Sequence, residues 1–256
     1  MEKKIVLIVE YDGSAYQGYQ VQKDKPTIQL EIEKALKALT GEESVKTIAS
    51  SRTDSFVHAL GQVVTFVTQS NIPPERFYLA MNTKLPRDIR VRKSYLADDT
   101  FHPRYDVVSK TYRYVTLLVD DDSAGLAIYR NGVNIEKRKD IKSFDKMNEA
   151  AELMVGKQDY ASFCSAGSSA KTTIRDVKRF DISREKVFDF DLLVFEVEAD
   201  GFLYNMVRIM SSILLLVGKQ EMSLLQVKEI IAKKDRTFAP PPAKPQGLYL
   251  CEVKYE

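Results

Sequence analysis

The residues best suited to chemistry lie in one polar segment, Ser50 to Ala59, between two apolar stretches; it contains Arg52, Asp54 and His58. A guanidinium two residues from a carboxylate can keep that carboxylate ionised and oriented, as a nucleophile or a general base requires. The same spacing also fits an aspartate that caps a turn and an arginine in a surface ion pair. The segment by itself leaves both interpretations open.

Two other positions combine polar chemistry with apolar surroundings. Arg208 interrupts an otherwise apolar helical pattern, and an unpaired buried guanidinium is costly, so we expect it to meet a carboxylate or phosphate or to face a cleft. A structural buried ion pair explains it equally well. Tyr112 and Tyr114 alternate along a predicted strand and therefore share a face, with Arg113 on the other. Core packing and base stacking are both consistent with that pair.

The sequence contains few of the residue patterns that bind metals or form a serine hydrolase site. The chain has two cysteines, Cys164 and Cys251, and two histidines, His58 and His102, without a His-x-x-x-His or Cys-x-x-Cys pair. We therefore expect no metal centre, no disulfide framework and a reducing compartment. A Ser-His-Asp hydrolase is disfavoured because no Gly-x-Ser-x-Gly motif occurs.

The elements that must position these residues follow from hydrophobic periodicity. In the first half we predict the order β-α-β-β-α-β, with strands at 4–10, 46–51, 62–68 and 89–96 and helices at 27–39 and 74–81. The second half repeats it, with strands at 109–119, 172–183, 190–198 and 248–255 and helices at 141–155, 202–217 and 223–233. Each half has the ferredoxin-like order.

This order predicts the α+β class: two ferredoxin-like halves, residues 1–105 and 106–256, joined into an extended, mainly antiparallel sheet. Helices would cover one face and leave a cleft on the other. The apolar segment 202–217 contains Asn205 and Arg208 and is too short for a membrane span, so we expect a buried helix. The amino terminus lacks a signal-peptide pattern and is predicted to be the first strand.

Charge is balanced overall but uneven along the chain. The 38 basic and 36 acidic side chains give a net charge of +2, and 44% of residues are hydrophobic, as in ordinary globular proteins. Residues 84–113 hold eight basic against four acidic side chains, and residues 171–186 hold six against three. Such segments could form a basic face for nucleic acid or could be solvated strand surfaces.

Five motifs, in order, closely resemble those of the tRNA pseudouridine synthase A family. They are YDGSAYQGYQ (11–20), RTD with VHA and GQVV (52–64), KTYRY (110–114), MVR (206–208) and GLYL (247–250). The resemblance runs from residue 5 to residue 255. It implies isomerisation of uridine to pseudouridine in the anticodon stem-loop of tRNA, at the thirty-eighth to fortieth nucleotides, without metal or other cofactor. It also implies that the enzyme is a homodimer, which we expect in the cytoplasm and not at a membrane.

The resemblance also implies roles for individual residues. Asp54 matches the catalytic aspartate that acts at the sugar C1′, Arg52 the arginine beside it, and Arg208 the arginine that pairs with that aspartate. Tyr112 matches the tyrosine that stacks on the target base and is a candidate for removing the C5 proton. Leu248 matches an apolar pocket wall, and His58 is a further substrate-binding candidate. The RNA would occupy the predicted cleft.

The chain departs from the family pattern around the aspartate. The family usually has glycine before Arg-Thr-Asp and a small residue and then glycine after it, whereas this chain has Ser51, Ser55 and Phe56. A missing glycine restricts the backbone if the turn needs a positive φ, and phenylalanine adds bulk beside the nucleotide.

Two alternatives remain open at this point. One is a catalytically weak RNA-binding or RNA-folding protein on the same scaffold, with Phe56 used for stacking. The other is an RNA-recognition module, which shares the β-α-β-β-α-β order but normally carries a Lys/Arg-Gly-Phe/Tyr-Gly/Ala-Phe-Val pattern that is missing here.

Overall fold

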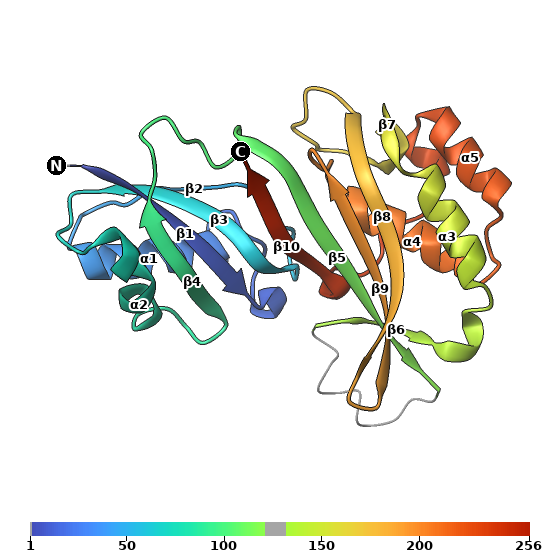
Figure 1. Ribbon diagram of the computed structural model, residues 1–256, viewed down its shortest axis with the longest axis horizontal. Coiled ribbons are helices and arrows are strands. Elements are labelled where there is room, and N and C mark those ends of the chain that lie inside the picture. The colour runs from blue at the N-terminus through green and yellow to red at the C-terminus, as the bar shows by residue number, and fades with distance from the viewer. Residues whose placement is uncertain (1, 121–131) are drawn as a thin grey trace. The chain divides into compact units, whose positions relative to one another are not determined.

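The computed structural model describes residues 2–120 and 132–256 (Figure 1). The chain divides into two compact units, one made of Met1–Val108 with Tyr249–Glu256 and the other of Ser109–Leu248. The predicted halves place residues 106–108 in the second half, whereas they belong to the first unit, and the two divisions also differ at residues 249–256. These residues form most of the last strand, which pairs with a strand of the first unit.

The first unit confirms the predicted β-α-β-β-α-β order. Its elements are β1 (Lys3–Tyr11), α1 (Ile28–Thr40), β2 (Thr47–Ala49), β3 (His58–Thr68), α2 (Phe77–Asn82) and β4 (Ile89–Leu96). Strand β3 pairs antiparallel with β1 and β2, and β1 pairs antiparallel with β4. β10 (Leu248–Tyr255) joins β3 in parallel, with Tyr249 opposite His58.

Apolar spacing explains why α1 and α2 cover this sheet. Ile28, Ile32 and Leu36 are buried along one side of α1, at helical spacing. α2 follows a short 3-10 turn at Pro74–Arg76, and its Phe77 meets Phe66 of β3 edge to face at 5.2 Å. The helices therefore seal one face of the sheet.

Apart from the strand predicted at 248–255, which lies mostly in the first unit, the second unit contains the elements predicted for the second half and two additional short strands. They are β5 (Val107–Val119), β6 (Asn134–Lys137), α3 (Phe144–Leu153), β7 (Gly156–Asp159), β8 (Ile174–Val187), β9 (Phe190–Ala199), α4 (Met206–Gly218) and α5 (Leu224–Lys233). Sheet order is β5-β9-β8-β7 with antiparallel neighbours, and β6 lies parallel to β5. Short 3-10 turns occur in this unit at Arg138–Asp140, Ala161–Phe163, Arg236–Phe238 and Pro245–Gly247, and in the first unit at Gly13–Ala15. The α+β class is confirmed.

α4 is the buried helix expected from its composition. It begins at Met206 rather than at 202, because Asn205 adopts a left-handed conformation with φ 62° and starts the helix there. α3 packs against both α4 and β8. None of the helices in residues 2–120 and 132–256 has the length and hydropathy that a membrane crossing requires.

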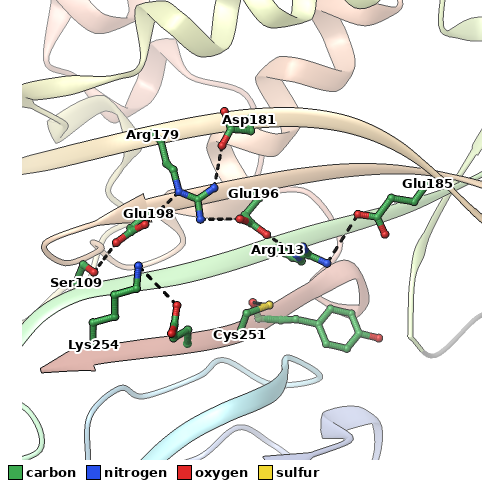
Figure 2. A network of polar contacts seen from close by, with 11 residues as sticks. Ser109, Arg113, Arg179, Asp181, Glu185, Glu196, Glu198, Cys251 and Lys254 are labelled. Carbon is green, nitrogen blue, oxygen red and sulfur yellow. Dashed lines mark hydrogen bonds and ion pairs between the residues drawn. The ribbon is translucent and has the colours of Figure 1, made fainter.

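A network of charged side chains covers the Arg113 side of β5, β9 and β8 (Figure 2). Arg179 contacts Glu196 at 2.6 Å, Glu198 at 3.1 Å and Asp181 at 2.8 Å. Arg113 pairs with the other oxygen of Glu196. The basic surplus counted along residues 171–186 is thus partly neutralised by carboxylates of β9, so this side of the sheet is not a purely basic surface.

This network predicts an acid-dependent loss of stability. Burial raises the pKa of Glu196, but hydrogen bonds from Arg113 and Arg179 outweigh it and hold that pKa below the usual value of 4.5. A carboxyl with a depressed pKa stabilises the fold above its unfolded-state pKa, and the stabilisation disappears as pH falls through the folded-state pKa. Glu196→Gln should lower the free energy of unfolding at pH 7 by roughly 1 kcal/mol or less and flatten its fall below about pH 4.5, measured by urea titration. An unchanged acid profile would contradict this.

Candidate functional site

Asp54 opens a tight turn between β2 and β3. The N–H of Val57 donates to the carbonyl of Asp54 at 3.2 Å, which closes a four-residue turn over Ser55 and Phe56. Phe56 sits at its third position with φ 66°. The side chain of Asp54 is half-buried and that of Arg52 is exposed.

Buried polar side chains anchor the chain on either side of Asp54. The Thr53 hydroxyl lies 2.8 Å from that of Tyr11, and the Thr53 carbonyl accepts from the N–H of Tyr19 at 3.1 Å. Gln62 accepts from the Ser50 hydroxyl at 2.7 Å and donates to the Ser51 carbonyl at 2.8 Å. Because its neighbours are fixed to the sheet, Asp54 has little backbone freedom, as a group that must meet one atom of a substrate requires.

Phe56 occupies the position where the family pattern has glycine. The turn does use a positive φ there, so this chain accepts a left-handed phenylalanine at a cost of roughly 1–2 kcal/mol. Its N–H donates to the carbonyl of Tyr16 at 3.2 Å, which helps to hold that conformation. The substitution therefore preserves the turn.

His58 is buried, with a relative exposure of 2%. Its Nδ1 accepts from the N–H of Gly13 at 3.1 Å, and its ring stacks on Tyr249 at 4.6 Å. Burial raises the pKa of Tyr249 to about 12, so this phenol keeps its proton at neutral pH. These contacts favour a positioning role for His58 at the start of β3 over the substrate contact predicted from sequence.

Tyr112 lies on the apolar face of β5 together with Tyr114. It is 6% exposed, and its ring meets Phe202 edge to face at 5.1 Å. The cleft was predicted on the face away from the helices, but Tyr112 contacts Phe202, which precedes α4. Arg113 lies on the opposite face of β5. Only the tertiary structure could identify Phe202 as the neighbour of Tyr112. Leu248, also buried, begins β10.

Arg208 is half-buried on the first turn of α4. Its Nε donates to the carbonyl of Ala243 and its Nη1 to Oδ1 of Asn205, each at 2.7 Å. Asn205 in turn donates to the hydroxyl of Ser165 at 3.0 Å. The guanidinium thus has neutral acceptors, in addition to any carboxylate or phosphate that it binds. The sequence places Asn205 inside a predicted helix at 202–217, and its contact with Arg208 emerges only because α4 begins at Met206, directly after it.

The candidate residues fall into two groups. Arg52, Asp54 and His58 belong to the first unit, and Tyr112, Arg208 and Leu248 to the second. Across residues 2–120 and 132–256, no group of three or more His, Cys, Asp or Glu side chains is arranged to hold a metal ion.

Comparison with known proteins identifies the class of molecule to which this fold and these residues belong. The family model described as tRNA pseudouridine synthase matches residues 7–106 and 150–256. A tRNA pseudouridine synthase A of Syntrophomonas wolfei is 43% identical over 254 residues, covering 98% of this chain and 97% of the relative. One of Acetivibrio thermocellus is 41% identical over 253 residues, covering 99% and 100%.

The chain is therefore an RNA-modifying isomerase. It belongs to the tRNA pseudouridine synthase family, and its reaction is pseudouridylation of tRNA.

The close approach of Gly18 to the Asp54 turn generates a stability prediction. Gly18 has φ +91°, and a Cβ there would lie 2.8 Å from the carbonyl oxygen of Thr53. Gly41 has φ +72° with nothing within 4 Å of the same position, which makes it a matched control. Gly41→Ala should cost about 1–2 kcal/mol through its backbone conformation alone. Gly18→Ala should cost about 1–3 kcal/mol more because the turn must move.

Urea unfolding of the two variants measures this difference. If Gly18→Ala and Gly41→Ala lowered the free energy of unfolding equally, the Thr53 carbonyl would be able to move without a cost in stability. The turn would then be less rigid than its hydrogen bonds indicate.

Proposed function

We propose that this protein converts uridine to pseudouridine in the anticodon stem-loop of tRNA, at the thirty-eighth to fortieth nucleotides, with Asp54 acting on the sugar C1′. The observation that carries the proposal is the anchored turn, which holds a half-buried carboxylate between Thr53 and Val57. A fixed carboxylate suits attack at a single carbon atom, since misplacement by about 1 Å can cost about 100-fold in rate.

The reaction balances without an external reagent. In the nucleophilic route, an Asp54 oxygen bonds to C1′ as the bond from C1′ to N1 breaks, and the electron pair leaves on the uracil. The base turns and C5 bonds to C1′ while the ester bond breaks and releases the carboxylate. The C5 proton is then removed, and N1 takes up a proton. If Asp54 instead triggers elimination at the sugar, it takes the C2′ proton as the C1′–N1 bond breaks and a C1′–C2′ double bond forms. The proton returns to C2′ when C5 bonds to C1′, so this route also balances.

The other candidate residues would prepare the nucleotide. A base inside a helix must be swung out at a cost of a few kcal/mol before C1′ can be reached. We assign stacking on the base and removal of the C5 proton to Tyr112, and an apolar wall of the pocket to Leu248. Arg52 and Arg208 would bind the nucleotide and the aspartate. The Arg208 guanidinium would be held in place beforehand by its two neutral acceptors, the Ala243 carbonyl and the Asn205 side chain. We further propose a cytoplasmic homodimer.

Phe56 supports one competing function, a catalytically weak RNA-binding protein on the same scaffold. Its side chain is half-buried and begins two residues from Asp54. If that ring occupies the place of the nucleotide, RNA would bind without being modified.

Replacing Asp54 tests the proposed chemistry. Asp54→Asn should abolish pseudouridine formation and leave tRNA affinity within a few-fold, because the carboxylate acts at C1′ while affinity comes mainly from phosphate contacts. Asp24→Asn is a matched control: Asp24 is exposed and has φ 57°, which asparagine tolerates. Single-turnover assays with mapping of pseudouridine give the readout, and activity should persist in a strong chelator. Turnover by Asp54→Asn near the parent rate would refute the assignment.

Replacing Ser55-Phe56 by Ala-Gly separates the two functions. If Phe56 lies away from the nucleotide, glycine adopts the same positive φ at no steric cost and activity should be kept or raised. If Phe56 blocks the nucleotide, the replacement should create activity where the parent has little. Loss of activity from an active parent, with the fold intact by circular dichroism, would contradict both and make Phe56 part of the catalytic apparatus.

A further inference from the structure

The segment that follows β4 is anchored across one face of the first unit's sheet. The N–H of Ala97 donates to the carbonyl of Lys4 at 2.9 Å, and the Lys4 ammonium donates to the carbonyl of Phe101 at 3.2 Å. Tyr255 holds the next residues: its hydroxyl donates to the carbonyl of Pro103 at 2.7 Å, and its ring meets Phe101 at 4.9 Å. Residues 97–103 therefore form a fixed strap.

At the end of the strap, His102 organises a tight loop. Its N–H donates to the Asp106 carboxylate at 2.7 Å, and its Nδ1 accepts from the N–H groups of Arg104 and Tyr105 at 3.1 and 3.2 Å. The ring of Tyr105 stacks on the His102 imidazole, with centroids 4.2 Å apart and planes 25° apart. Tyr105 is nevertheless 76% exposed. The loop thus holds an aromatic ring in one orientation and leaves most of its surface to solvent.

A cavity of about 370 Å³ lies beside this loop. Its walls include Lys46, just before β2, and Ile48 of β2. Thr65 of β3 and the strap residues Phe101 and His102 complete this part of the lining. Two lysines, Lys4 and Lys46, line it, and the lining as described contains no carboxylate. A cavity of this size, lined by apolar and polar side chains in similar number, is large enough for a small planar ligand.

We propose that this loop and cavity form a second nucleotide-binding site, which stacks an unpaired base of the tRNA substrate on Tyr105 and holds the adjoining phosphate with Lys46 and Arg104. Both cations are exposed. The inference rests on the proposed function for its ligand, but the site lies on residues that the reaction at Asp54 does not use.

The fixed, exposed aromatic ring favours a nucleobase as the occupant. Asp98, Asp99 and Asp106 belong to the same segment, but the Asp106 carboxylate is engaged with the His102 N–H. Stacking works on every base because each has a π-face, and it contributes roughly 1–3 kcal/mol per base. The ring is already held in place by His102, so little conformational entropy is lost on binding.

The test compares Tyr105→Ala with Tyr105→Phe, which keeps the ring and removes only the hydroxyl. Tyr105→Ala should weaken binding of full-length transcribed tRNA by about 5- to 150-fold, whereas Tyr105→Phe should stay within about twofold. The rate of pseudouridine formation in single turnover at saturating enzyme should be unchanged in both. Lys46→Gln should lower the slope of log affinity against log salt by about one unit.

Three results would overturn the site. Parent-like affinity of Tyr105→Ala would remove the stacking contact, and equal weakening by Tyr105→Phe would show that the hydroxyl matters instead of the ring. A change of oligomeric state in light scattering, with tRNA affinity unchanged, would assign the loop to contact with a second copy of the chain. A parent that binds tRNA without modifying it would refute the proposed chemistry while leaving the affinity comparison valid, so the two failures are distinguishable.

Discussion

The candidate catalytic turn depends on a small set of buried hydrogen bonds beneath it. Tyr11 from β1 and Gln62 from β3 reach Thr53, Ser50 and Ser51 from the sheet, and in doing so satisfy polar groups that would otherwise be buried without partners. Each of these bonds connects the turn to a strand that is itself paired on both sides. A displacement of the turn would therefore break several bonds at once, which is why its tip can hold a phenylalanine in a left-handed conformation.

The second unit is built on a different principle, the division of one sheet into an apolar face and a charged face. Tyr112 and Tyr114 are buried on one side of β5, while Arg113 on the other side joins carboxylates of β8 and β9. The ion pairs match acids and bases across neighbouring strands, so most of the local charge is compensated within the sheet. The apolar face can then carry Tyr112, the aromatic side chain that we assign to the nucleotide.

Preorganisation links the proposed reaction to the proposed second site. In both places hydrogen bonds made by side chains fix a loop before any ligand arrives: those of Thr53 and Gln62 hold the chain around Asp54, and those of His102 hold the chain around Tyr105. Binding energy is then available to extract and orient the nucleotide, because little of it is needed to order the protein.

The sequence alone determined the element order, the α+β class and the family, because hydrophobic periodicity and the motifs around Asp54 and Tyr112 are local properties of the chain. It missed β6 (Asn134–Lys137) and β7 (Gly156–Asp159), whose short polar sequences lack alternation and which form by pairing with β5 and β8. It also could not assign residues 249–256 to the first unit, show that Phe56 carries a positive φ, or find the contacts of Tyr105. These features depend on hydrogen bonds and packing between residues far apart in the chain, and only the tertiary structure decides which distant groups meet.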